Sequence, residues 1–97
     1  MQREAMTWGD LFLQQIARPP EGLALHFARH EWGANITYIV RCAEVQTVRI
    51  ALEGGRWLTW GGDVKTSDGQ HDLFLDFGSE GELRVVCGSL AIERETT

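Results

Sequence analysis

The run HDLFLDFGSEGELRVVCGSLAIE, residues 71–93, decides the fold, because its apolar residues recur at every second position. A period of two is the pattern of a β-strand with one buried and one exposed face. The glycine-bounded segment 78–81 between the first two alternating runs is typical of a turn. We therefore expect antiparallel strands whose buried face consists of Leu73, Leu75, Phe77, Leu83, Val85, Cys87, Leu90 and Ile92.

The same alternation continues upstream of this run. Residues 23–29 and 36–42 predict two further strands, joined by a loop over HEWGAN, residues 30–35. The segment TVRIALEGGRWLTW, residues 47–60, alternates on both sides of Gly54-Gly55, which predicts a two-residue hairpin with Arg49 opposite Trp60. Residues 43–46 fit either a turn or the continuation of a long bent strand.

The N-terminal segment has a helical period instead. Thr7 is suited to cap a helix, and the proline pair at 19–20 would end one. A helix over about 8–18 would place on one face Trp8, Leu11, Phe12 and Ile16. Such a short helix is not stable alone, so we expect it to pack on the sheet.

These patterns predict a single domain over residues 1–97. The expected fold class is α+β but mainly β: a short N-terminal helix, about 8–18, followed by an antiparallel meander of about six or seven strands, about 23–93. A strongly twisted sheet with the helix on one face and a small open barrel fit equally well.

Composition places the chain among ordinary folded domains, with 43% hydrophobic and 24% charged residues. No apolar run is long enough for a signal peptide or a membrane-spanning helix, so the sequence predicts a cytoplasmic protein without membrane partners. In that compartment Cys42 and Cys87 are expected to be reduced thiols of the core.

The charge is unevenly distributed. Residues 1–60 carry six acidic and six basic residues, whereas residues 61–97 carry eight acidic and three basic ones, so the whole net charge of −5 lies in the second part. This imbalance disfavours direct binding to nucleic acid and favours a basic protein partner. The alternative is an acidic sheet face that only keeps the protein soluble.

No chemistry-bearing pattern indicates an enzyme, a cofactor or a metal site. Asp72 and Asp76 are four residues apart on one expected strand, about 13 Å, which is too far for a pair of carboxylates acting on one bond. The same spacing separates His26 from His30 and argues against a shared zinc ion. A hydrolase using His71 would lack a positioned nucleophile.

Two tryptophans are candidates for a binding surface. Trp32 falls in an expected turn, where it is either folded back on the sheet edge or used in recognition. Trp60, opposite Arg49, forms either a cation–π pair on the expected outer face or part of a recognition patch. The complete expected partner-binding set is Asp68, Asp72, Asp76, Glu80, Glu82, Trp32 and Trp60.

The C-terminal run resembles the ending of small β-rich immunity proteins of bacterial polymorphic-toxin systems, including immunity protein family 50. The positions that carry the resemblance are Leu73, Leu75, Phe77, Gly78, Gly81, Leu83, Val85, Cys87, Leu90 and Ile92. The resemblance implies a non-enzymatic inhibitor that binds a cognate toxin, such as a nuclease, and blocks its active site. A phage-encoded inhibitor of a host defence nuclease, or a small ligand-binding or structural β domain, are the alternatives.

Overall fold

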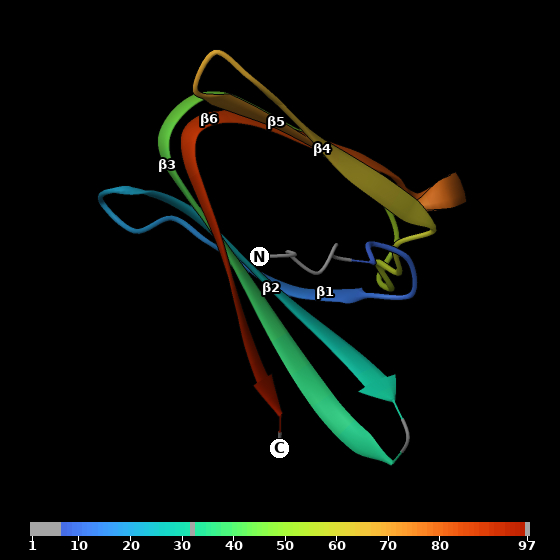
Figure 1. Cartoon of the computed structure of the whole chain (residues 1–97). Coiled ribbons are helices and arrows are strands. Elements are labelled where there is room, and N and C mark those ends of the chain that lie inside the picture. The colour runs from blue at the N-terminus through green and yellow to red at the C-terminus, as the bar shows by residue number, and fades with distance from the viewer. Residues whose placement is uncertain (1–6, 32, 97) are drawn as a thin grey trace.

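The computed structural model describes residues 7–31 and 33–96, and they form one antiparallel sheet (Figure 1). Its spatial order is β1-β2-β3-β6-β5-β4. The fold is mainly β, as the alternating pattern predicts. The elements are β1 (Phe12–Ala17), β2 (Gly22–Glu31), β3 (Ala34–Leu52), β4 (Gly61–Ser67), β5 (Gln70–Asp76), the 3₁₀ turn η1 (Gly78–Glu80) and β6 (Gly81–Thr96).

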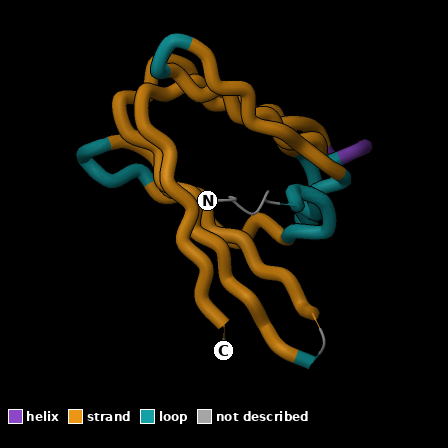
Figure 2. The backbone as a smooth tube through the Cα atoms, in the orientation of Figure 1, coloured by secondary structure: helices purple, strands orange, loops and turns teal. Residues whose placement is uncertain are grey.

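Two long strands, β3 and β6, bend and carry the sheet over onto itself (Figures 1 and 2). The first part of β3 pairs with both β2 and β6, and its second part pairs with β6 alone. The register between β3 and β6 shifts between Val45 and Thr47, next to Glu44, whose φ is 53°. Such a bulge increases the local bend, so residues 43–46 continue a long bent strand.

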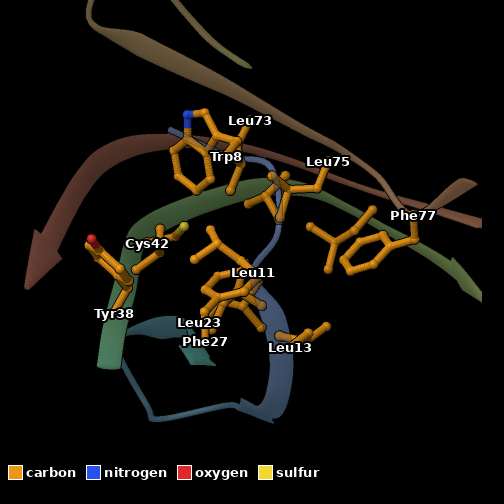
Figure 3. Close-up of a cluster of buried hydrophobic side chains, with 14 of the residues drawn as sticks. Trp8, Leu11, Leu13, Leu23, Phe27, Tyr38, Cys42, Leu73, Leu75 and Phe77 are labelled. Carbon is orange, nitrogen blue, oxygen red and sulfur yellow. The ribbon is translucent and has the colours of Figure 1, made fainter. Parts of the chain in front are cut away.

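The core fills the concave side of the curled sheet. Figure 3 shows side chains of β5 facing those of β1 and β2 across the interior. The expected buried positions of β5 and of the first half of β6 are confirmed, whereas Leu90 is half-buried and Ile92 is 40% exposed. The buried residues form one hydrophobic cluster, which consists of Trp8, Leu11, Leu13, Leu23, Leu25, Phe27, Ile36, Tyr38, Val40, Cys42, Leu73, Leu75, Phe77, Leu83, Val85 and Cys87.

A short contact joins the two edges of this open sheet. The segment before β4 lies against the start of β1, where Leu13 N donates to Trp57 O and Thr59 N donates to Leu11 O, each at 2.9 Å. The buried Thr59 hydroxyl donates to Trp8 O and accepts from Leu11 N, so it fixes the N-terminal segment to the same place.

The predicted N-terminal helix over 8–18 is wrong, because residues 12–17 form β1. Leu11 and Leu13 point inward and Phe12 outward, as in a strand. A register shift between Leu13 and Gln15 then moves the inward phase to Ile16. This bulge turns an alternating pattern into one that imitates the spacing of a helix.

The predicted hairpin over 47–60 is also wrong. Gly54 does adopt a positive φ of 82°, but the chain leaves the sheet there instead of returning along β3. Arg49 lies opposite Arg84 of β6, and Trp60 lies near the end of β5. On this stretch β3 pairs with β6, from a distant part of the sequence, and not with the local segment that follows the glycines.

Candidate protein-interaction surface

Among the residues that the structure describes, Trp60 is the most exposed large apolar one, at 71% exposure. Its backbone N–H donates to Asp76 O at 2.7 Å, which fixes this residue to the end of β5. Its ring rests on Gly78, since a Cβ atom on that glycine would lie 2.3 Å from Trp60 Cε2. The indole is therefore held against η1 with most of its surface open to solvent.

Three acidic residues lie around this turn. The Asp76 side chain accepts from Gly78 N at 2.9 Å. Glu53 N donates to Glu80 O at 2.8 Å, and the Glu80 carboxylate folds back over Gly54, where an added Cβ would lie 1.8 Å from Oε2. We call Trp60, Gly78 and the three acids Glu53, Asp76 and Glu80 the Trp60 corner.

Asp72 and Glu82 belong to a neighbouring but different surface. They lie in a shallow depression of about 440 Å³ on the outer face of the sheet. Its lining residues are Arg49, Asp63, Lys65, Asp72, Phe74, Glu82 and Arg84, three bases and three acids around one aromatic ring. The formal charges of this depression therefore cancel.

The Asp72–Arg84 pair accounts for part of that cancellation. Arg84 Nε and its terminal nitrogen donate to the two carboxylate oxygens of Asp72 at 2.9 and 2.6 Å. These hydrogen bonds, together with the charges of Arg84 and Lys65, lower the pKa of Asp72. Asp72 is thus occupied within the molecule and contributes less to an attractive acidic field than the sequence suggests.

The remaining predicted site residues lie elsewhere. Asp68 occupies the turn between β4 and β5, with a φ of 52°. Because β5 separates that turn from Asp76, the two are about 20 Å apart along the strand. Trp32 lies outside the described residues. The structure therefore groups Trp60, Asp76 and Glu80 but does not join all the expected residues into one surface.

Sequence reasoning missed Glu53 and Gly78 as parts of the corner. The hairpin predicted about Gly54-Gly55 would place Glu53 opposite Arg56, but this hairpin does not form. The guanidinium of Arg56 instead lies 6.0 Å from the centre of the Phe12 ring. A signal for Gly78 was present, because a glycine at the end of an alternating run marks a turn, and Gly78 has a positive φ of 64°.

Two histidines and both cysteines contact other side chains of the protein itself. His30 Nδ1 lies 3.0 Å from Asn35 Oδ1, and His71 Nδ1 lies 3.0 Å from Thr66 Oγ1. Cys42 and Cys87 are buried, unbridged and in side-chain contact; burial is the main cause that raises the pKa of the Cys42 thiol to about 12. Within residues 7–31 and 33–96, no three His, Cys, Asp or Glu residues are grouped to hold a metal ion.

The described part of the chain contains no helix long and apolar enough to cross a membrane. Fold and surface together describe a small curled antiparallel β protein with an exposed aromatic residue among acids. Comparison of the chain with protein-family models, with curated proteins and with solved structures gave no match.

Proposed function

We propose that this chain is a non-enzymatic protein that binds a basic protein partner through the Trp60 corner. The observation that carries the proposal is the 71% exposure of Trp60, whose indole is held against Gly78 beside acidic residues. Tryptophan is enriched among residues that dominate binding energy, and surrounding charges steer a complementary partner. Asp76 and Glu80 supply that charge beside the ring.

The fixed position of the indole favours binding. A side chain that is already held in place loses little conformational freedom when a partner covers it. The backbone bond from Trp60 to Asp76 and the contact with Gly78 both restrict Trp60. An anchor of this kind typically contributes about 2 kcal/mol or more to binding.

We further propose that the partner is a toxin, for example a nuclease with a basic active-site surface, and that this chain is its cytoplasmic immunity protein. The resemblance of residues 71–93 to immunity proteins supports this version. A phage-encoded inhibitor of a host nuclease would use the same surface. The identity of the neighbouring gene separates the two.

A small ligand-binding domain has less support. The outer-face depression is lined by six charged residues and one aromatic residue, whereas ligand pockets are lined mainly by apolar side chains. On the concave side, buried apolar side chains from both ends of the sheet face one another (Figure 3).

The test is affinity capture from a lysate of the cells that encode this chain, followed by binding measurements with the purified captured protein. The variants are Trp60→Ala and the double reversal Asp76→Lys/Glu80→Lys. The matched controls are Ile92→Ala and Glu95→Lys, which alter an exposed apolar and an exposed acidic residue of β6 outside the corner. We expect Trp60→Ala to weaken binding about 30-fold or more, and the controls to bind as wild type.

Salt and toxicity complete the test. Raising the salt concentration should slow association of the wild type more than that of the double reversal. The immunity version also requires that the captured protein is toxic when expressed alone and harmless when expressed with this chain. An acidic partner, or equal capture by wild type and both corner variants, would contradict the proposal.

A further inference from the structure

A further feature of the sheet is the outer edge of β4, whose first residue, Gly61, directly follows Trp60 and lies opposite Asp76. Strand β4 is last in the sheet order and pairs only with β5. The contact that joins the sheet edges involves residues 57–59 and not β4 itself. The backbone groups on the outer side of residues 61–67 therefore lack a strand partner in the described part of the chain, and such an edge is a template for another strand.

The sequence of this edge, GGDVKTS, is complementary to itself in the antiparallel direction. Asp63 and Lys65 line the same outer-face depression, whereas Val64 lies opposite the buried Leu73 and packs against the core. If two copies of β4 pair about Val64, each Asp63 lies directly opposite Lys65 of the second copy. The two Val64 side chains then meet at the symmetry axis.

The other registers with a common outer face are unfavourable. In a two-fold pairing that keeps the faces aligned, moving the axis by one residue in either direction places like charges opposite each other. An axis at Asp63 pairs Asp63 with itself, and an axis at Lys65 pairs Lys65 with itself. Only the axis at Val64 overlaps all seven residues of β4 and also forms two opposite-charge pairs.

Small residues complete the fit. Gly61 and Gly62 have no side chain to hold the backbones apart, and in this register they lie opposite Ser67 and Thr66 of the second copy. All of these residues except Gly61 and Val64 are exposed, so pairing requires no unfolding. A lysine usually protects an edge strand from pairing, but here the second copy supplies the carboxylate that compensates it.

From this register we infer that the chain forms a two-fold dimer in which the β4 strands pair edge to edge about Val64. The partner is a second copy of the chain, and the product is one continuous sheet of two times six strands. The two outer-face depressions become neighbours across the axis, because Asp63 and Lys65 line both the depression and the interface.

The experiment is sedimentation velocity of the wild type and three variants, Asp63→Lys, Lys65→Asp and the combined exchange. A single short edge gives a small interface, so the concentration should span about 10 µM to about 1 mM at low salt. We expect each single reversal to weaken the dimer about tenfold or more, since it replaces two attractive pairs by two repulsive ones. The combined exchange should restore the wild-type dissociation constant.

The single variants control for net charge. Asp63→Lys makes the chain less acidic and Lys65→Asp makes it more acidic, so a general charge effect would shift them in opposite directions. The amides of residues 61–67 should also gain hydrogen-exchange protection as concentration rises. A monomeric wild type at every concentration, opposite shifts of the single variants, or no restoration by the exchange would overturn the dimer without affecting the Trp60 proposal.

Discussion

Replacing Thr59 by Val should detach the N-terminal segment from the closing contact of the sheet. Thr59 is completely buried, and its hydroxyl serves both Trp8 O and Leu11 N, the latter at 2.9 Å. Valine nearly conserves the volume but leaves a buried acceptor and a buried donor unpaired. Each such group costs about 1 to 3 kcal/mol, so for the two groups we expect the free energy of unfolding to fall by about 2 to 6 kcal/mol.

That loss is a large part of the stability of a small domain, which is about 5 to 15 kcal/mol. At about 4 to 8 °C per kcal/mol for this chain length, the midpoint of thermal unfolding should fall by about 10 °C or more. Urea unfolding followed by tryptophan fluorescence measures the free energy directly. The dependence on urea should keep its slope if only the native contact is lost.

The matched control is Thr59→Ser, which keeps the hydroxyl and removes one methyl group. Its expected cost is about 1 kcal/mol, from lost apolar burial. The reasoning therefore requires the valine variant to be less stable than the serine variant. If valine were as stable as serine, the backbone bonds between 11–13 and 57–59 would be sufficient, and the hydroxyl would have no part in closing the sheet.

Three further changes test individual contacts. In Gly78→Ala, a Cβ would lie 2.3 Å from the Trp60 ring at a φ of 64°, so we expect a loss of about 1 to 3 kcal/mol and a changed tryptophan emission. Cys42 and Cys87 should react with a thiol reagent only after unfolding, because burial raises the pKa of both thiols; reaction of the native protein at neutral pH would refute this. Asp72→Asn should cause a small loss of stability at pH 7 that disappears in acid, as a comparison of urea midpoints across pH would show. The hydrogen bonds from Arg84 hold the folded pKa of Asp72 below its ordinary value of 3.8. The contribution of Asp72 to stability is therefore present above that pH and is lost as the pH falls through the lowered value. An unchanged difference between the two proteins in acid would speak against the ion pair as its cause.

The strands that could be predicted are those whose alternation is uninterrupted. Residues 73–77 and 83–87 keep one phase throughout, and all their expected inward residues are buried. The same holds for residues 36–42, where Ile36, Tyr38, Val40 and Cys42 face the core. A period of two over five or more residues leaves one choice of face, because a slip of one residue would expose the whole apolar set.

The elements that could not be predicted contain a bulge or a non-local pairing. In β1 the register shift after Leu13 changes the phase, and the remaining apolar spacing fits a helix. The segment 47–60 has a local turn signal at Gly54, but its strand pairs with β6, about thirty residues further along the chain. Local patterns indicate which face of a strand is apolar. They do not indicate which strand from a distant part of the sequence will pair with it.

The same reason explains the division of the acidic segment. Counting charges along residues 61–83 treats every carboxylate as available, but folding brings Arg49 and Arg84 onto the face that holds Asp63, Asp72 and Glu82. These opposite charges cancel much of the field over the depression.

At the Trp60 corner, Glu53, Asp76 and Glu80 form no ion pair that would cancel them among the described residues. The attractive potential for a basic partner is therefore concentrated where the exposed indole lies. Charge reversal at the corner should then weaken association more than the same reversal at Asp72, although both belong to one acidic run in the sequence.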